Sequence, residues 1–348
     1  MILRGGLIGC GKIVRDIHVS VWQSIGGLHI QSVCDPDEAA RSEVAGRLGD
    51  ARAYSDVNRM LDENQDLDFV SIATPGFTHY DLSKRAIHRG LNVIVEKPLA
   101  LSLADARALV EQATLANVRL CVGQTYRYRD SVLVIRRAIE QGQVGRIYQV
   151  DTTHHGESIF NDQASWIWSE QEHRVLLYEH AIHFLDLQVY FAGPLKRIVG
   201  LDVRRDEHVK ATTHVHALIE HTSGVIGHID LQLFASSNYT QIEVFGTAND
   251  ATLKFSPDGW QLYSGRVNPL DEMLAGFKRT AGFVMPTLVA KFRPPALPRK
   301  ARSHHRVFSG FVRALHDGSL VLPVSGEDVL PTMELLEALA VPTYGGAL

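Results

Sequence analysis

The 348-residue sequence lacks any apolar run near the roughly 18 residues that a membrane-spanning helix needs, and its start lacks a secretory leader pattern. A charge excess of one sign is also missing, because 35 Lys and Arg face 39 Asp and Glu. This balance argues against general nucleic-acid binding. Cysteine is scarce: Cys10, Cys34 and Cys121 are scattered and lack metal-ligand spacing. We expect a cytoplasmic protein with no membrane span and no nucleic-acid partner, whose thiols are reduced and buried.

The first 123 residues alternate short apolar runs with amphipathic stretches. The runs expected to form buried strands are Ile2–Ile8, Leu28–Cys34, Phe69–Ala73, Leu91–Val95 and Val118–Val122. The stretches expected to form helices are Lys12–Trp22, Asp37–Leu48, Thr78–Arg89 and Ser102–Leu115. Such alternation is typical of a doubly wound parallel sheet. The sequence therefore predicts an α/β protein with an N-terminal Rossmann dinucleotide-binding domain over residues 1–123.

The pattern changes after Gln124, where strands follow one another at short intervals. Two helices are expected at Ser131–Glu140 and Leu176–Phe191, and a last one at Gly326–Leu339 after a Ser325 cap. The expected strands are Ile147–Thr153, Ile198–Val203, Thr213–Glu220, Val225–Leu233, Gln241–Gly246 and Ala251–Phe255. Residues 124–348 are thus predicted to form a substrate-binding α+β domain with a large, mainly antiparallel sheet. Because the helices would cover one face, the other is free to pair subunits in a homodimer or homotetramer.

Residues 273–316 form a basic, proline-containing segment without a single acidic residue. We interpret it as a solvated crossover between the sheet and the last helices. The alternative is an arm that contacts anions, another subunit or a membrane surface, because Gly276–Ala290 mixes apolar and basic residues.

A glycine turn, Gly9-Cys10-Gly11-Lys12-Ile13, joins the first strand to the first helix. Its first glycine allows the tight turn, and its second lets the backbone approach a pyrophosphate at the helix N-terminus. Val14 takes the third position of the motif, which is normally Gly or Ala. Asp35 ends the second strand and can accept hydrogen bonds from the adenosine ribose, which favours NAD over NADP. Alternatively, Asp35 or Asp37 is a helix N-cap, and Arg41 keeps NADP possible.

Two further turns fall at the carboxyl ends of predicted strands, where ligands of open α/β sheets bind. Thr74-Pro75 follows one strand, and His79 beyond it would either contact the cofactor or lie exposed to water at the start of a helix. Glu96-Lys97-Pro98 follows the run Leu91–Val95. A lysine fixed there by proline suggests a cation beside the reacting carbon of a nicotinamide enzyme.

Together these motifs resemble the glucose–fructose oxidoreductase / inositol dehydrogenase / MocA family. The resemblance covers most of the chain, weakens between Met273 and His304, and includes Tyr126-Arg127-Tyr128, Gly142-Gln143-Val144-Gly145-Arg146-Ile147, His183-Phe184-Leu185-Asp186 and Gly193. It implies that Glu96 binds the nicotinamide ribose, that Lys97 acts at the reacting hydroxyl, and that the sheet domain forms the substrate wall. The residues expected at the cofactor are Gly9, Cys10, Gly11, Lys12, Ile13, Asp35, Thr74, Pro75, His79, Glu96 and Lys97.

A second candidate cluster lies in the longer helix of the C-terminal domain. In a regular helix Glu179, His183 and Asp186 share a face. A carboxylate beside an imidazole fixes its tautomer and raises its basicity, which suits a general base. The family typically has Asp-x-Gly-x-His-x-x-Asp here, so Glu179 and Ala181 depart from its pattern, as does the preceding His173-Arg174-Val175. These departures indicate a substrate other than those of the common sugar and inositol dehydrogenases.

The histidines of the C-terminal domain have other interpretations. Those of the helix could be packing residues, or His180, His183 and Asp186 could hold a metal with His154 or His155. We expect no metal, because hydride transfer with a lysine needs none. Six sheet histidines could line the pocket or an interface: His154, His155, His214, His216, His221 and His228. Three aromatic residues could stack on a sugar-like ring or fill the core: Phe160, Trp166 and Trp168.

The motifs together predict reversible hydride transfer between NAD(P) and a carbinol carbon of a sugar, inositol or related polyhydroxylated substrate. Lys97 would stabilise the developing alkoxide, and His183, oriented by Glu179 or Asp186, would take the hydroxyl proton. The residues expected at the substrate are Lys97, Tyr126, Arg127, Trp166, Glu179, His183 and Asp186. One alternative is an NAD-dependent glycosidase or lyase that oxidises its substrate transiently, with Tyr178 or His180 as an extra acid or base. Another is a non-catalytic nucleotide-binding protein.

Overall fold

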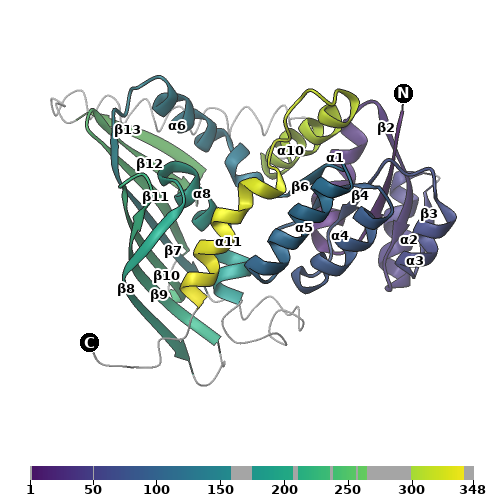
Figure 1. Cartoon of the computed structure of the whole chain (residues 1–348), viewed down its shortest axis with the longest axis horizontal. Coiled ribbons are helices and arrows are strands. Elements are labelled where there is room, and N and C mark those ends of the chain that lie inside the picture. Colours follow the sequence, from purple (N-terminus) through teal and green to yellow (C-terminus); the bar gives the residue numbers. More distant parts are fainter. Residues whose placement is uncertain are drawn as a thin grey trace, which may run out of the picture.

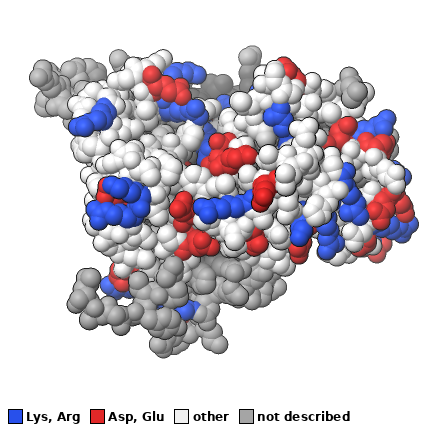
Figure 2. All heavy atoms as spheres, viewed as in Figure 1, with Lys and Arg blue, Asp and Glu red and all other residues white. Residues whose placement is uncertain are grey.

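The computed structural model describes residues 2–49, 51–157, 175–206, 211–235, 238–255, 258–264 and 299–340. Figure 1 shows two sheets in separate parts of the molecule, with helix α11 (Gly326–Ala340) running between them. No helix in these ranges is long and apolar enough to cross a membrane. On the face shown in Figure 2, basic and acidic side chains are interspersed.

The N-terminal sheet has six strands in the order β3-β2-β1-β4-β5-β6, and all neighbours are parallel. The strands are β1 (Leu3–Ile8), β2 (Leu28–Cys34), β3 (Arg52–Tyr54), β4 (Phe69–Ile72), β5 (Asn92–Val95) and β6 (Leu120–Val122). The strand order reverses beside β1, which creates the switch point at which ligands of such sheets bind. The predicted Rossmann architecture is confirmed.

Helices connect these strands, and their starts follow local signals. They are a π-helical turn (Val14–His18) that continues as α1 (Val19–Ser24), then α2 (Glu38–Leu48), α3 (Val57–Glu63), α4 (His79–His88) and α5 (Leu103–Leu115). Asp37 caps α2 by accepting the N–H of Ala40, and Ser102 caps α5 by accepting the N–H of Asp105. The sequence missed β3 and α3, because elements this short show no clear periodicity.

The C-terminal sheet has seven strands in the order β13-β12-β11-β7-β10-β9-β8. The strands are β7 (Ile147–Glu157), β8 (Leu195–Asp206), β9 (Ala211–His221), β10 (Ile226–Ala235), β11 (Tyr239–Gly246), β12 (Asn249–Phe255) and β13 (Asp258–Ser264). Neighbours are antiparallel except β7 and β10. The prediction of a mainly antiparallel sheet is confirmed. The sequence missed β13, and most of the strands are longer than predicted.

The helices of the second domain place the site against this sheet. Helix α8 (Ile182–Ala192) follows a π-helical turn (Val175–Ala181) and packs on β7. Its Gln188 accepts a hydrogen bond from Thr152 Oγ1 at 2.6 Å and donates one to the carbonyl of Val150 at 2.9 Å. Helix α6 (Asp130–Glu140) packs on β12 and β13. The predicted helix 176–191 is therefore present, but its first turn is not α-helical.

Helix α10 (Arg299–His316) corrects the interpretation of the basic segment. It packs against α1 of the N-terminal domain (Figure 1), where the Phe308 ring lies 4.5 Å from that of Trp22 and the Phe311 ring 5.6 Å from that of Phe69. A solvated crossover is wrong for this part, because an apolar face accompanies the basic one and is buried. Residues 273–298 lie outside the described ranges.

Candidate active site

The glycine turn after β1 lets a ligand reach the backbone. Gly9 has a φ of 97°, and a Cβ there would lie 2.4 Å from the carbonyl oxygen of Ala73, so this position requires glycine. A Cβ on Gly11 would meet nothing within 4 Å, so the backbone there borders open space. Lys12 and Ile13 are exposed where the helix begins. These features fit a pyrophosphate at a helix N-terminus.

Asp35 lies beside this turn, at the end of β2. Its Oδ2 accepts the N–H of Cys10 at 2.7 Å, and its Oδ1 accepts the N–H of Asp37 at 2.8 Å. The helix cap of α2 is Asp37, so the alternative that Asp35 has this role is wrong. Asp35 keeps unused acceptor capacity, because a carboxylate offers about four lone-pair positions. Arg41 donates to the carbonyl oxygen of Pro36 at 3.0 Å, close by.

His79 joins two loops at the carboxyl edge of the sheet. Its ring nitrogens lie 2.9 Å from the carbonyl oxygen of Thr74 and 2.6 Å from that of Pro98. The side chain is fully buried, so the alternative of a water-exposed histidine is wrong. Burial lowers its pKa, although both polar contacts oppose that shift. In this position His79 holds the Thr74-Pro75 turn against the Lys97-Pro98 turn.

Glu96 sits at the end of β5 in a nearly closed environment. Its Oε1 lies 3.0 Å from Nε2 of His18, and 13% of its side chain is exposed. A Cβ on Gly123 would lie 3.0 Å from its Oε2, so glycine leaves room for the carboxylate. Burial alone raises the pKa of Glu96. The contact with His18 and the charges of His304 and Lys97 outweigh burial and hold this pKa at about 2.

Lys97 points from the sheet edge to the helix of the second domain. Its Nζ lies 3.2 Å from Oε2 of Glu179 and donates to the carbonyl oxygen of Glu179 at 3.1 Å. The two side chains are 15% and 21% exposed, so the pair is shielded but reachable. Residues 82 positions apart in the sequence therefore meet where the two domains join.

His183 lies near this pair and is held by an aromatic ring. It stacks on Tyr126 with centroids 4.1 Å apart and an interplanar angle of 9°. Its Nδ1 is buried without a hydrogen-bond partner. Burial, followed by the charge of Lys97, lowers the pKa of His183 well below its usual range. His183 is therefore neutral near pH 7, in the form that can accept a proton.

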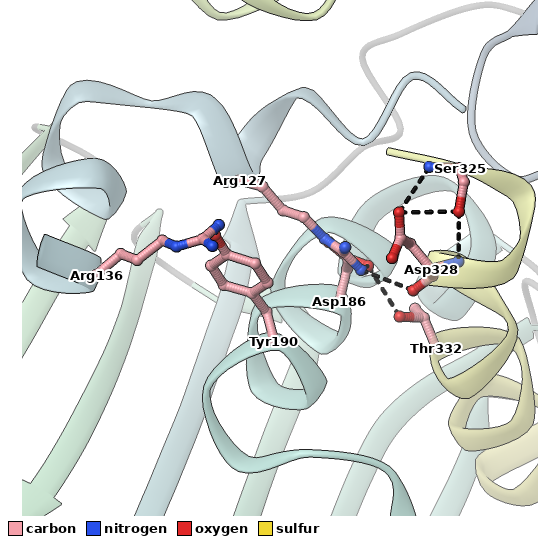
Figure 3. A network of polar contacts seen from close by, with 7 residues as sticks. All are labelled: Arg127, Arg136, Asp186, Tyr190, Ser325, Asp328 and Thr332. Atoms are coloured by element: carbon pink, nitrogen blue, oxygen red, sulfur yellow. Dashed lines mark hydrogen bonds and ion pairs between the residues drawn. The ribbon is translucent and has the colours of Figure 1, made fainter. Parts of the chain in front are cut away.

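Asp186 does not orient His183, contrary to the expectation from helical spacing. Its carboxylate accepts two hydrogen bonds from the Arg127 guanidinium, both of 2.7 Å, and one from Thr332 at 2.8 Å (Figure 3). Arg127 also donates to the carbonyl oxygen of Asp328 at 3.0 Å. The predicted alignment with Glu179 fails because the π-helical turn changes the angle between its residues and those of α8. Arg127 and Asp186 bind each other rather than facing a substrate.

Comparison with known proteins assigns this arrangement to a family. Residues 3–124 match the model described as an oxidoreductase family with an NAD-binding Rossmann fold, and residues 132–252 match the GFO/IDH/MocA C-terminal domain. A D-apiose dehydrogenase from Paraburkholderia graminis is 31% identical over 261 residues, or 73% of this chain and 68% of that one. This protein belongs to the GFO/IDH/MocA oxidoreductase family.

Two further similarities agree with this membership. An inositol 2-dehydrogenase from Pseudarthrobacter chlorophenolicus is 27% identical over 243 residues, or 68% of this chain and 69% of that one. The solved structure of an oxidoreductase from Agrobacterium radiobacter, in complex with NAD+, L-tartaric acid and magnesium, has the same fold. The TM-score is 0.77 at 21% identity, over 98% of this chain and 97% of that one. The GFO/IDH/MocA protein is thus an NAD-dependent oxidoreductase, and the resemblance seen in its sequence is confirmed.

Three of the sheet histidines of this oxidoreductase contact carboxylates of the sheet rather than Lys97. His155 and His216 both contact Asp230, at 2.9 and 3.2 Å, and His228 contacts Asp151 at 3.2 Å. These residues lie on the sheet face opposite α8, which we call the outer sheet face. Of the three histidines, His216 and His228 border a hollow of about 540 Å³ there. The contacts of these three histidines are with carboxylates of the sheet and not with the residues of the candidate active site.

The predicted aromatic residues and the sheet histidine His154 do not form part of the described GFO/IDH/MocA site. Trp166, Phe160 and Trp168 lie outside the described residues. His154 contacts Thr240 Oγ1 at 2.8 Å and is buried in the sheet.

Sequence reasoning missed His18 and His304, whose ring nitrogens lie within 4.8 Å of a Glu96 oxygen and of each other. His18 follows the glycine turn by two helical turns, a spacing that could have pointed to it. His304 is distant in sequence and gave no signal.

Proposed function

We propose that this oxidoreductase transfers a hydride between NAD and a CH–OH carbon of a polyhydroxylated substrate such as a sugar, an inositol or a related polyol. The pairing of Lys97 with Glu179 carries the proposal, because it places a cation between the cofactor edge of the Rossmann sheet and the second domain. Relatives named D-apiose dehydrogenase and inositol 2-dehydrogenase support the substrate class.

The chain's own groups fit the cofactor. NAD, when bound, supplies the hydride acceptor on its nicotinamide ring. Gly9 and Gly11 would border its pyrophosphate, Asp35 its adenosine ribose, and Glu96 its nicotinamide ribose. The charge of Asp35 disfavours a 2′-phosphate, so NAD is preferred over NADP.

Lys97 and His183 have different roles at the substrate hydroxyl. The Lys97 ammonium has three N–H groups, and Glu179 engages it through a carboxylate and a carbonyl oxygen. A remaining N–H can stabilise the negative charge that develops on the substrate oxygen. The neutral imidazole of His183 accepts the hydroxyl proton while Tyr126 fixes the plane of its ring. Glu179 thus positions the lysine and does not orient the histidine.

A lysine substitution tests the proposal. The assay is NADH formation with a panel of sugars, inositols, other polyols and hydroxy acids. We expect Lys97→Met to lower kcat/KM by roughly 10²- to 10⁴-fold while NADH affinity stays within a few-fold, because the lysine acts on the substrate. Arg59→Met is the matched control, since Arg59 also pairs with a glutamate, Glu63 at 2.8 Å, but on the exposed side of α3. Wild-type turnover by Lys97→Met would refute the role.

The same assay separates the alternative reaction classes. A dehydrogenase releases one NADH per turnover, whereas a glycosidase or lyase that oxidises its substrate transiently forms product without net NADH. Formation of product without NADH would show that the net reaction is that of a glycosidase or lyase and not the proposed dehydrogenation. Absence of turnover on every substrate, with NADH still bound, would favour a non-catalytic nucleotide-binding protein.

We also propose that the outer sheet face pairs subunits in a homodimer or homotetramer. Its support is the row of histidine–carboxylate contacts on an otherwise solvent-facing sheet. A monomer in sedimentation analysis at micromolar concentration would exclude this. A reducing, cytoplasmic setting fits the three cysteines, all buried and free.

A further inference from the structure

His18 and His304 approach the Glu96 carboxylate from two helices that are far apart in the sequence. His18 ends the π-helical turn that starts at the glycine motif, and His304 lies in the first turns of α10. One ring nitrogen of each histidine and one carboxylate oxygen of Glu96 all lie within 4.8 Å of one another. The two histidine rings are 5.5 Å apart, and Phe308 packs on the edge of the His18 ring at 4.9 Å. We call these three residues the Glu96 cluster.

A carboxylate in this position needs cationic or donor neighbours. Burying an uncompensated charge is costly, and an apolar ring forms one wall of this site. The Lys97 ammonium is turned toward Glu179, so only the backbone N–H of Lys97 reaches the Glu96 carboxylate, at 3.4 Å from Oε2. The other titratable groups around Glu96 are His79 and His183, whose pKa values both respond to its charge. The two histidines of the cluster are therefore the groups placed to stabilise its ionised form.

The cluster also contains buried polar atoms that no protein group satisfies. Glu96 Oε1 and both ring nitrogens of His18 lack a well-aligned hydrogen bond, although the ion-pair distance is 3.0 Å. Buried polar atoms are rarely left in this state unless a ligand or water completes them. Glu96 lies at the end of β5, on the opposite side of the switch point from Asp35, which is the half of the site that takes the nicotinamide ribose.

We propose that His18 and His304 are positioning residues that hold the Glu96 carboxylate toward the hydroxyls of the nicotinamide ribose. Helix α10 thereby completes the cofactor site, although it comes from the C-terminal part of the chain. This inference rests on the proposed role of Glu96 in binding NAD. It assigns a cofactor function to the end of the basic segment that the sequence suggested was solvated.

Binding titrations with two nucleotides test the inference. NADH spans both halves of the site, whereas ADP occupies only the half at Asp35. We expect His304→Gln to weaken NADH binding roughly tenfold, the usual effect of losing one hydrogen bond to a charged group, and to leave ADP binding unchanged. His305→Gln is the matched control, because His305 is the next residue of α10 and is not part of the Glu96 cluster. Equal loss of NADH and ADP binding would indicate general damage to the domain and overturn the inference.

A double-variant cycle shows whether the histidine acts through the carboxylate. Glu96→Gln should weaken NADH binding, and adding His304→Gln should cause no further loss. Additive losses would mean that His304 acts independently of Glu96, against the inference. His18→Gln should behave in the same way. If burial of His18 prevents that variant from folding, the His304 cycle decides alone.

The outcomes distinguish this inference from the proposed function. If Glu96→Gln leaves NADH affinity intact, the proposed ribose contact fails. If Glu96→Gln weakens binding but neither histidine variant does, only the positioning role fails. Two imidazoles and a carboxylate also suit Zn²⁺, so wild-type protein is titrated after treatment with a chelator. Loss of NADH binding that Zn²⁺ restores would make the cluster a metal site and overturn the inference.

Discussion

The buried pair of Arg127 and Asp186 gives a stability prediction that also decides a mechanistic question. The guanidinium and the carboxylate are 9% and 0% exposed, and two hydrogen bonds of 2.7 Å join them. Thr332 from α11 adds a third bond at 2.8 Å, so the network ties the segment after β6 to α8 and to the last described helix (Figure 3). Asp186→Asn changes one atom and removes the negative charge.

The expected loss follows from leaving a buried cation without its partner. Removing one member of a buried ion pair typically costs about 3–5 kcal/mol, because the remaining charge stays desolvated. The side-chain oxygen of the substituted asparagine can still accept from one donor, but its amide N–H groups would face the Arg127 guanidinium. We therefore expect the free energy of unfolding to fall by about 3–5 kcal/mol, a large part of the roughly 5–15 kcal/mol of a typical domain.

Urea denaturation followed by fluorescence and circular dichroism measures this loss. The control is the double variant Arg127→Met/Asp186→Leu, which removes both charges and should recover most of the stability. The folded Asp186→Asn protein should keep the wild-type pH dependence of kcat/KM, because Asp186 does not contact His183. An unchanged denaturation midpoint together with a shifted acid limb of that profile would refute the reasoning and restore Asp186 as the residue that orients the base.

Three further predictions concern other parts of the molecule. His154 has a folded pKa lowered to about 3 by burial, with smaller contributions from two neighbouring histidines. As the pH falls, His154 therefore takes up a proton in the unfolded chain before it does so in the folded protein. Its contribution should lower the free energy of unfolding by about 2 kcal/mol between pH 7 and pH 5. Urea denaturation at the two pH values should show that His154→Gln abolishes this contribution. Gly9→Ala should lower the free energy of unfolding by at least about 2 kcal/mol and abolish NADH binding, because the added Cβ would meet the carbonyl oxygen of Ala73. Wild-type NADH affinity of this variant in a fluorescence titration would contradict this prediction. Asp35→Asn should narrow the preference for NADH over NADPH roughly tenfold by removing one charge at the ribose, whereas unchanged affinity ratios would exclude that role.

Local pattern was enough to predict most of the parallel sheet. The strand at residues 28–34 was predicted with its observed bounds, and the turns at Gly9, Asp35 and Glu96 fall where β1, β2 and β5 end. Buried strands are recognisable in the sequence as short apolar runs, and glycine or a capping side chain marks the turn that follows. Helix α10 was missed, because its basic residues and the preceding prolines obscured an apolar face that became evident only when it met Trp22 and Phe69.

The sequence by itself determined the succession of a parallel and a mainly antiparallel sheet, the glycine turn after β1 and the placement of Lys97 at a strand's carboxyl end, because each depends on residues close together in the chain. Tertiary structure alone decided the partners of the functional side chains. It paired Lys97 with Glu179 across 82 positions and Arg127 with Asp186 across 59, and it brought His18 and His304 to Glu96. Regular helical spacing predicted that Glu179 and Asp186 share a face with His183. That prediction failed because a π-helical turn precedes α8. The geometry of that turn and the packing of α10 depend on contacts between distant segments, which local periodicity does not record.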